Sequence, residues 1–200
     1  FYDNRSAREQ VEQYINRSFE VHLAEQMPVR KNKGISNQPL IWRYFVSPAP
    51  RRFDDFDDGA DEDGFIAQFV MRINDFFEGA FVASSGKNMG AFKAVGYPED
   101  VGDFYRLDEY KGYLWTAHGR FPTNTPGWWG GAHPFTLLDW SVVHNGEVSS
   151  YDTNRRFLEM YGYRCSLQTD TEVITYLFDL LIRQHELSLE DCGSVVAAPF

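Results

Sequence analysis

The amino-acid sequence predicts an α+β fold whose sheets are mainly antiparallel. Apolar residues recur at helical spacing near the N-terminus and again in the last fifty residues, and short strand-like runs separated by turn residues lie between them. Strands grouped in the middle of a chain, with helices before and after, are typical of layered α+β domains. The 200 residues, 43% of them apolar, are enough for one domain with its own core.

Near the N-terminus, residues 6–24 are predicted to form a helix. A capping-box pattern begins at Ser6, and four apolar residues then share one helical face. These four are Val11, Tyr14, Ile15 and Phe19. The periodicity is then lost, and one strand over 40–46 is predicted between two loops. Residues 1–64 are thus expected to comprise a helix, a loop and an acidic insertion.

The acidic insertion, residues 54–63, is the steepest run of negative charge in the chain. Its spacing does not match a calcium-binding loop. With Gly59 or Gly64 as the loop glycine, a required ligand position falls on an apolar residue or on a glycine. Since blocks of like charge usually stay in water, a solvated acidic loop is favoured over a metal site.

Residues 65–200 are predicted to be the motif-bearing core of a single domain spanning residues 1–200. A buried helix is expected over 65–77, because its apolar residues recur at helical spacing. Later helices are predicted from cap residues followed by apolar faces. They begin at Pro98, at Ser150 or Asp152, at the capping box of Thr169 and Glu172, and at Ser188.

Four strands are predicted between these helices. Runs over 79–84 and 90–95 flank a polar turn and predict a hairpin. Two further strands are expected over 113–118 and 140–144, the second ending at a turn-forming Asn-Gly pair.

Composition excludes several classes of partner. A formal net charge of −10 argues against nucleic acid and against an anionic membrane surface, since both are approached through clustered Lys and Arg. The two cysteines show no metal-site or disulfide pattern. No apolar run approaches the roughly 20 residues of a membrane span, and no leader opens the chain. The expected location is the cytoplasm.

Polar side chains with ligand-binding chemistry gather at the ends of predicted elements. Arg120 offers a donor fork that fits a carboxylate, and Asp170 offers a negative charge that fits an ammonium group. Asn145 and Gly146 offer the N–H donors of an oxyanion hole, and Thr123 lies close to Arg120 in sequence. Singly, each has a plainer interpretation: a surface ion-pair partner for the arginine, a hairpin turn for the Asn-Gly pair, and a helix cap for the aspartate.

Three histidines in the same region raise the alternative of a metal hydrolase. His118, His133 and His144 could in principle form a zinc triad. No two of them share the helical spacing of a metal-binding pair, so structural histidines are favoured and no metal is expected.

Four motifs resemble those of class II glutamine amidotransferases, the N-terminal nucleophile hydrolases. They are H-G-R-F-P-T-N-T at 118–125, A-H-P-F at 132–135, V-H-N-G-E-V at 143–148 and T-D-T-E-V-I at 169–174. Within that superfamily they look most like the amidotransferase subunit of archaeal-type glutamate synthase. The runs S-S-G-K-N-M-G at 84–90 and G-Y-P-E-D at 96–100 add to this likeness.

The resemblance implies a four-layer αββα sandwich in which L-glutamine is hydrolysed to glutamate and ammonia. Matching the motifs assigns Arg120, with Phe121 and Thr123 beside it, to the substrate carboxylate. It assigns Asn145 and Gly146 to the oxyanion hole and Asp170 to the α-amino group. These roles coincide with those suggested by side-chain chemistry.

The resemblance also implies a partner. No cofactor is expected in this domain, and ammonia would pass to a glutamate-synthase-type synthase domain or subunit that carries FMN and an iron–sulfur cluster and aminates 2-oxoglutarate. The rival hypothesis is a non-catalytic amidotransferase-like module that binds an amino acid or a partner subunit.

One element of the family pattern is not matched. The family nucleophile is an N-terminal cysteine whose own amine serves as base, whereas this sequence begins with Phe1. Cys165 and Cys192 lie far from that position. The nucleophile and the first strand are therefore expected upstream of Phe1, and the C-terminal end of the domain beyond Phe200.

Overall fold

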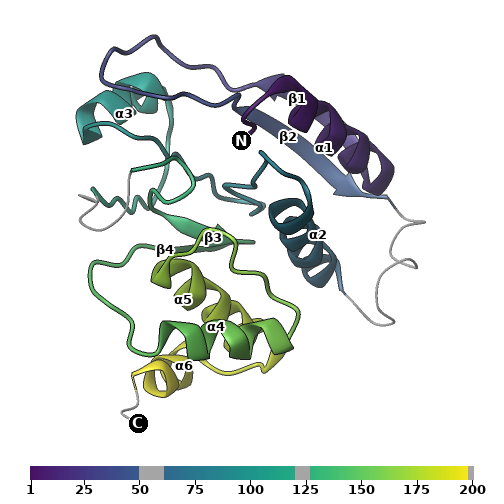
Figure 1. Cartoon of the computed structure of the whole chain (residues 1–200), viewed down its shortest axis with the longest axis vertical. Coiled ribbons are helices and arrows are strands. Elements are labelled where there is room, and N and C mark those ends of the chain that lie inside the picture. The colour runs from purple at the N-terminus through teal and green to yellow at the C-terminus, as the bar shows by residue number, and fades with distance from the viewer. Residues whose placement is uncertain (50–60, 120–126, 198–200) are drawn as a thin grey trace.

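The structure is a computed structural model that describes residues 1–49, 61–119 and 127–197. Helices and two small antiparallel sheets confirm the α+β class (Figure 1). The elements in chain order are α1 (Arg5–Ser18), β1 (Phe19–Gln26), β2 (Trp42–Pro48), α2 (Glu62–Phe76), α3 (Pro98–Phe104), the 3₁₀ helix η2 (Leu107–Glu109), β3 (Phe135–Leu137), β4 (Trp140–Val142), α4 (Tyr151–Met160), α5 (Asp170–Asp179), the π-helix η3 (Leu180–Gln184) and α6 (Leu189–Val196).

The predicted helix over 6–24 is correct only as far as Ser18. Beyond it, apolar residues at every second position favour a strand, and β1 pairs antiparallel with β2, with Phe19 opposite Pro48. Phe19 fits both periodicities, which is why the sequence pattern extended the helix too far. The cap also differs, because the side chain of Asn4, not Ser6, accepts the hydrogen bond from the Ala7 backbone N–H at 2.9 Å.

Removing this cap is expected to have a moderate effect. Asn4→Ala should lower the free energy of unfolding by about 1 kcal/mol, because the Ala7 N–H loses its acceptor. Asn4→Asp is the matched control, since aspartate caps about as well as asparagine. Urea denaturation followed by circular dichroism measures both. Equal losses in the two variants would contradict the capping role.

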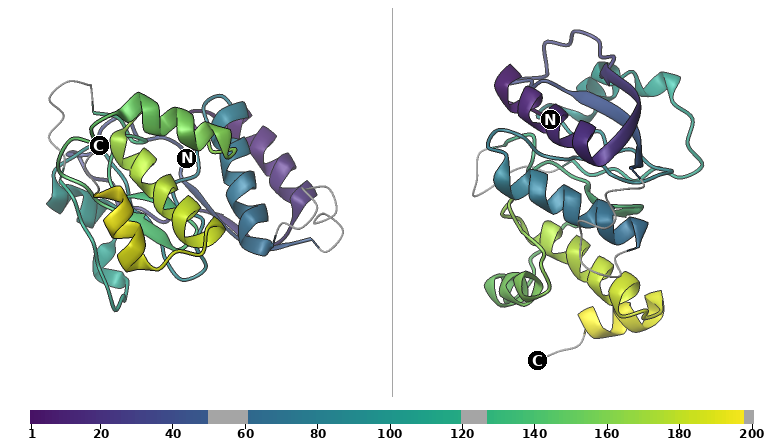
Figure 2. Two further views of the ribbon diagram at one scale, coloured as in Figure 1. Left: turned by 90° about the horizontal axis from the view of Figure 1, so that it is seen from below. Right: turned by 90° about the vertical axis from the view of Figure 1, so that its right-hand side faces the viewer.

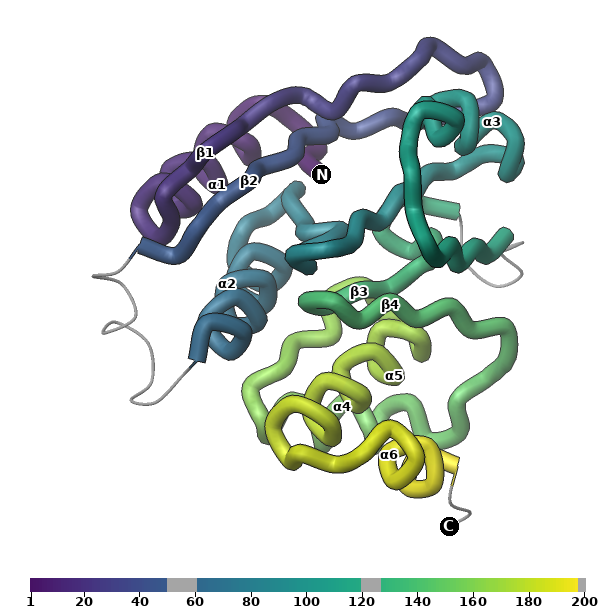
Figure 3. The backbone as a smooth tube through the Cα atoms, turned by 180° about the vertical axis from the view of Figure 1, so that it is seen from behind, coloured from purple at the N-terminus to yellow at the C-terminus, as the bar shows by residue number. Residues whose placement is uncertain are grey.

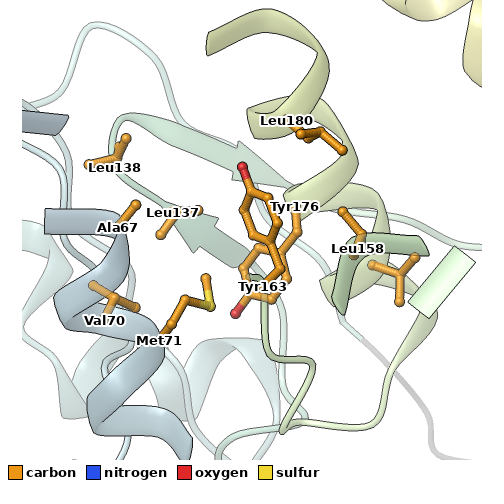
Figure 4. Packing of buried hydrophobic residues seen from close by; sticks show 10 residues of the cluster. Ala67, Val70, Met71, Leu137, Leu138, Leu158, Tyr163, Tyr176 and Leu180 are labelled. Carbon is orange, nitrogen blue, oxygen red and sulfur yellow. The ribbon is translucent and has the colours of Figure 1, made fainter. Parts of the chain in front are cut away.

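Helix α2, which confirms the helix predicted over 65–77, lies between the two halves of the molecule (Figure 2). One side packs Phe65, Phe69 and Ile73 against residues of α1 and β1. The other side packs against β3, α4 and α5 (Figure 4). Residues on that second side are Ala67, Val70 and Met71.

The hairpin predicted over 79–84 and 90–95 is wrong. The two runs do not pair with each other. The start of the first run forms an isolated antiparallel bridge between Ala80 and Tyr2, and its later backbone groups bond to side chains. The N–H of Val82 donates to Oδ1 of Asn74 on α2 at 2.8 Å, and Oγ1 of Thr136 on β3 donates to the Ala83 carbonyl at 2.8 Å. These partners satisfy the backbone hydrogen bonds of the run without the predicted hairpin.

The strand predicted over 113–118 is also wrong, because these residues belong to no strand of the described structure. Tyr113 is 97% exposed and Leu114 71%, so the apolar side chains that suggested a strand face solvent in the described structure. The strand over 40–46 is confirmed with a shift, as β2.

The second half of the chain follows the sequence more closely. β4 confirms the strand over 140–144 in shortened form, and it pairs antiparallel with β3, which was not predicted. α5 packs against both strands (Figures 1 and 3). The helices expected after Ser150, Thr169 and Ser188 are all present.

Part of the acidic insertion, residues 54–60, lies outside the described residues. The last residues of the insertion, 61–63, are the cap residue and the start of α2. The side chain of Asp61 caps this helix by accepting from the Gly64 N–H at 2.7 Å. Within the described ranges, no helix has the length and apolar character required to cross a membrane.

Candidate functional site

The predicted site residues divide into two groups. Arg120, Phe121 and Thr123 lie outside the described residues. Asn145, Gly146 and Asp170 are described, and the structure brings them together although they are far apart in sequence.

Asp170 is the first residue of α5, but it is not the cap. The side chain of Thr169 caps the helix by accepting from the Glu172 N–H at 3.2 Å. The Asp170 carboxylate faces the segment after β4 instead, where Oδ2 accepts from the Val148 N–H at 3.3 Å. The plainer interpretation of Asp170 as a helix cap is therefore wrong.

Asn145 and Gly146 follow β4 in an exposed segment. They do not form a hairpin turn, because β4 pairs with the preceding strand β3 and the next element is the helix α4. The plainer interpretation of this pair is thus also wrong. Their N–H groups lie on the segment that the Asp170 carboxylate holds through the Val148 N–H.

His133 and Thr171 support the Asp170 carboxylate from the buried side. The Thr171 hydroxyl donates to Oδ1 of Asp170 at 3.3 Å, and Nε2 of His133 lies 3.0 Å from the same hydroxyl oxygen. A hydroxyl carries one proton, so Nε2 of His133 must be the donor in that second bond. The ring of His118 lies against that of His133, with centroids 4.3 Å apart.

His144 lies on the opposite side of the carboxylate. Its Nδ1 is 3.6 Å from Oδ2 of Asp170. His133 thus contacts the Thr171 hydroxyl, His144 lies near the Asp170 carboxylate, and His118 packs on His133. Among the described residues, no group of three or more His, Cys, Asp or Glu side chains is positioned to hold a metal ion.

Two buried charged groups near this site were missed in the sequence. Lys93 is 2% exposed, donates to the Gly130 carbonyl at 2.9 Å and lies over the Phe135 ring. Glu172 is 1% exposed and accepts from the N–H groups of Ser166 and Leu167. Burial lowers the pKa of Lys93 to about 7 and raises the pKa of Glu172 to about 7. The sequence signal for Glu172 was a capping box, and Lys93 gave none.

Neither cysteine is activated. Cys192 is fully buried, and burial raises the pKa of its thiol. Burial and then the nearby Glu172 carboxylate raise the pKa of the Cys165 thiol well above its usual range. A nucleophilic cysteine needs the opposite environment, one that favours the thiolate.

Two hollows of the described structure lie elsewhere. A cavity of about 210 Å³ is lined by residues that include Lys87 and Asp139. A larger groove of about 660 Å³ runs between α2 and the turn after α4. Asn145, Gly146 and Asp170 line neither of them.

Comparison with known proteins identifies a family. Residues 6–178 match the model of the glutamine amidotransferases class-II. A protein of Archaeoglobus fulgidus, described as uncharacterized, is 51% identical over 96% of this chain and 50% of its own length. A glutamine--fructose-6-phosphate aminotransferase of Vibrio vulnificus is 34% identical over 56% of this chain and 18% of its own length.

An amidophosphoribosyltransferase of Methanocaldococcus jannaschii is likewise 34% identical, over 54% of this chain and 23% of its own length. The chain thus spans half the length, or less, of these curated relatives. No solved structure matches it.

Proposed function

Because the chain belongs to the class II glutamine amidotransferases, we propose that it binds L-glutamine and forms the glutaminase part of an enzyme that hydrolyses glutamine to glutamate and ammonia. The observation that carries the proposal is the contact between the Asp170 carboxylate and the segment that bears Asn145 and Gly146. This contact supports the proposal, because it joins the carboxylate proposed for the ammonium group to the segment that carries the proposed oxyanion donors.

In this proposal Asp170 binds the α-amino group, and Asn145 and Gly146 stabilise the negative charge that develops on the amide oxygen. Arg120, Phe121 and Thr123 bind the substrate at its carboxylate end, as the motif match implies. An arginine fork and a carboxylate select for a molecule with both charges of an amino acid. The four-layer αββα sandwich is proposed for the whole domain on family membership.

The nucleophile is assigned to neither Cys165 nor Cys192, because burial disfavours the thiolate of both. This assignment leaves the N-terminal cysteine of the family pattern as the proposed nucleophile. The burial of both cysteines also favours a second candidate function, a module that binds glutamine without cleaving it. Replacing both cysteines, as Cys165→Ala with Cys192→Ala, should leave glutaminase activity of the whole enzyme intact, and loss of activity with the fold preserved would reassign the nucleophile.

The binding step is tested by titration calorimetry with L-glutamine. Asp170→Asn is expected to weaken binding about 10- to 100-fold, because a hydrogen bond between charged groups contributes about 1.5 to 3 kcal/mol. Asp152→Asn is the matched control, since Asp152 is also a first-turn aspartate but its side chain is 74% exposed. Glutaramate, which lacks the α-amino group, should bind both proteins equally.

Unchanged glutamine affinity in Asp170→Asn would overturn the assignment of Asp170. If neither the parent nor the control binds glutamine, the substrate itself is wrongly assigned.

The ammonia acceptor is proposed to be a glutamate-synthase-type partner that carries FMN and an iron–sulfur cluster, on the motif resemblance. Two relatives are instead named for a fructose-6-phosphate aminotransferase and an amidophosphoribosyltransferase. Co-elution from a sizing column separates these alternatives. The chain should co-elute with a glutamate-synthase-type synthase subunit and not with the sugar-phosphate domain of an aminotransferase, and the reverse result would redirect the proposal.

A further inference from the structure

The side chain of His144 lies between the two functional groups of the site. Its Nδ1 faces Oδ2 of Asp170 at 3.6 Å. On the other edge of the ring, a β-carbon built on Gly146 would lie only 2.9 Å from Nε2. One imidazole ring thus lies close to both the carboxylate of Asp170 and Gly146 of the Asn-Gly pair.

We infer that His144 is a positioning residue that couples the carboxylate of Asp170 to the backbone N–H of Gly146. The inference rests on the proposed function for the roles of Asp170 and Gly146. It goes beyond that function, because it makes recognition of the substrate amine set the geometry of the oxyanion hole.

The coupling follows from how tightly each partner is held. Oδ1 of Asp170 is bound by the Thr171 hydroxyl, which is buried and contacts His133, and Oδ2 is bound by the Val148 N–H. These contacts fix the carboxylate on α5. Gly146 belongs to an exposed loop with no helix or strand of its own. The ring and the loop are therefore the parts that adjust.

The gap between His144 and Asp170 supports such an adjustment. Nδ1 of His144 is buried and makes no hydrogen bond within the part of the chain that the structure describes. A buried ring nitrogen without a partner is unfavourable. A movement of a few tenths of an ångström toward Oδ2 would form a bond of ordinary length. The same movement shifts the edge of the ring that contacts Gly146.

An ammonium group bound to Asp170 would share Oδ2 with His144 and change this distance. The ring would then move against Gly146 and reorient its N–H. A ligand without an α-amino group would leave the ring and the loop unchanged. The coupling through His144 therefore favours amides that carry an α-amino group. Such a ligand is bound by Asp170 and also reorients the Gly146 N–H. It also gives a steric reason for glycine at residue 146.

The test measures the ¹H–¹⁵N resonance of Gly146 by NMR and does not require glutamine. Asp170→Asn weakens the charge that faces His144, so it should shift the Gly146 resonance in the parent protein. The shift caused by Asp170→Asn should be at least about threefold smaller in a His144→Ala background, as expected for two coupled sites. His118→Ala is the control, since that ring contacts His133, not Asp170, and the full shift should persist there.

A second variant separates the two edges of the ring. His144→Asn keeps a side-chain N–H near the Nδ1 position but removes the edge that contacts Gly146, so the coupling should be lost in it as well. Unaltered resonances from α2 would show that each variant is folded. Persistence of the full shift in His144→Ala would overturn the inference.

The ligand arm distinguishes this inference from the proposed function. L-glutamine should move the Gly146 resonance more than glutaramate does in the parent, and equally in His144→Ala. Coupling without glutamine binding would refute the proposed substrate and leave the inference standing. Glutamine binding without coupling would refute the inference alone.

Discussion

Phe65→Ala is expected to lower the free energy of unfolding by about 3 to 5 kcal/mol, the usual loss when a fully buried phenylalanine is truncated. Phe65 has no solvent exposure and lies in the first turns of α2. Its ring is 5.3 Å from that of Phe19 on β1, measured between centroids. The cavity would open where α2 meets the N-terminal sheet, and the rigid sheet and helices can collapse into it only partly.

Phe76→Ala is the matched control, because it removes the same side chain from the same helix. Phe76 is 74% exposed, so its truncation should change the free energy of unfolding by no more than about 0.5 kcal/mol. Urea denaturation followed by tryptophan fluorescence measures both variants. A loss below about 1 kcal/mol for Phe65→Ala would contradict the central place of α2 in the core.

The helices were predictable because their signals are local. Thr169, Ser188 and the apolar face of α2 can each be recognised within one or two turns of sequence, and each has the predicted role in the structure. Ser6 is not the cap because another cap residue, Asn4, stands two residues earlier. Cap positions can be ranked from sequence only by residue type, and asparagine and serine rank almost equally.

The strands were less predictable because their partners are distant in sequence. Residues 79–84 have a strand-like pattern, yet the groups that satisfy their backbone are the backbone of residues 1–3 and the side chains of Asn74 and Thr136. Phe19 matches a helical pattern, but in the structure it pairs with Pro48 of β2. A pattern of apolar residues reports burial and does not state which neighbour provides it.

The sequence predicted which residues form the candidate site but not how their side chains contact one another. Side-chain chemistry singled out Asp170 and the Asn-Gly pair, and the fold holds Asp170 against the segment that bears this pair, through the Val148 N–H. Side-chain chemistry did not indicate that His144 would lie between Asp170 and Gly146, because the direction of a side chain at the end of a strand depends on the loop that follows. Burial of Lys93 and Glu172 was equally hidden, since both residue types are mostly exposed in proteins.

Titration of the Glu172 carboxyl is expected to change the free energy of unfolding by about 3 kcal/mol. Burial raises its pKa from 4.5 to about 7, against the opposing effect of hydrogen bonds from Leu167, Tyr176 and Ser166 and of the Lys93 charge. Between these two pKa values the folded state binds more protons than the unfolded state. Its contribution to stability is therefore complete below about pH 4.5 and is lost as the pH rises through about 7.

Lys93 should act in the opposite direction. Burial lowers its pKa from 10.5 to about 7, so the folded state binds fewer protons than the unfolded state between those values. Its contribution is complete above about pH 10.5 and is lost as the pH falls through about 7. In the folded state Glu172 is charged above about pH 7 and Lys93 below it. The summed cost of the two buried groups is therefore largest near neutral pH.

Comparison of variants with the parent isolates these two groups, because the effects of all other titrating groups cancel to first order. The stability of the parent relative to Glu172→Gln should fall by about 3 kcal/mol between about pH 5 and about pH 8. Relative to Lys93→Met, it should rise between about pH 7 and about pH 10. Glu190→Gln, which removes a carboxylate from an exposed position on α6, is the control for the first comparison.

At pH 7, Lys93→Met also shows whether burial or the attraction between Lys93 and Glu172 dominates the effect of the buried charges. If burial dominates, Lys93→Met stabilises the protein or leaves it unchanged, because methionine fills a similar volume and needs no charge partner. If attraction between Lys93 and Glu172 dominates, Lys93→Met costs several kcal/mol because it leaves an uncompensated carboxylate. Desolvation by burial is the largest influence on the pKa of both groups, so we expect the first result. Equal pH profiles for the parent and both variants would show that neither group titrates in the buried environment described.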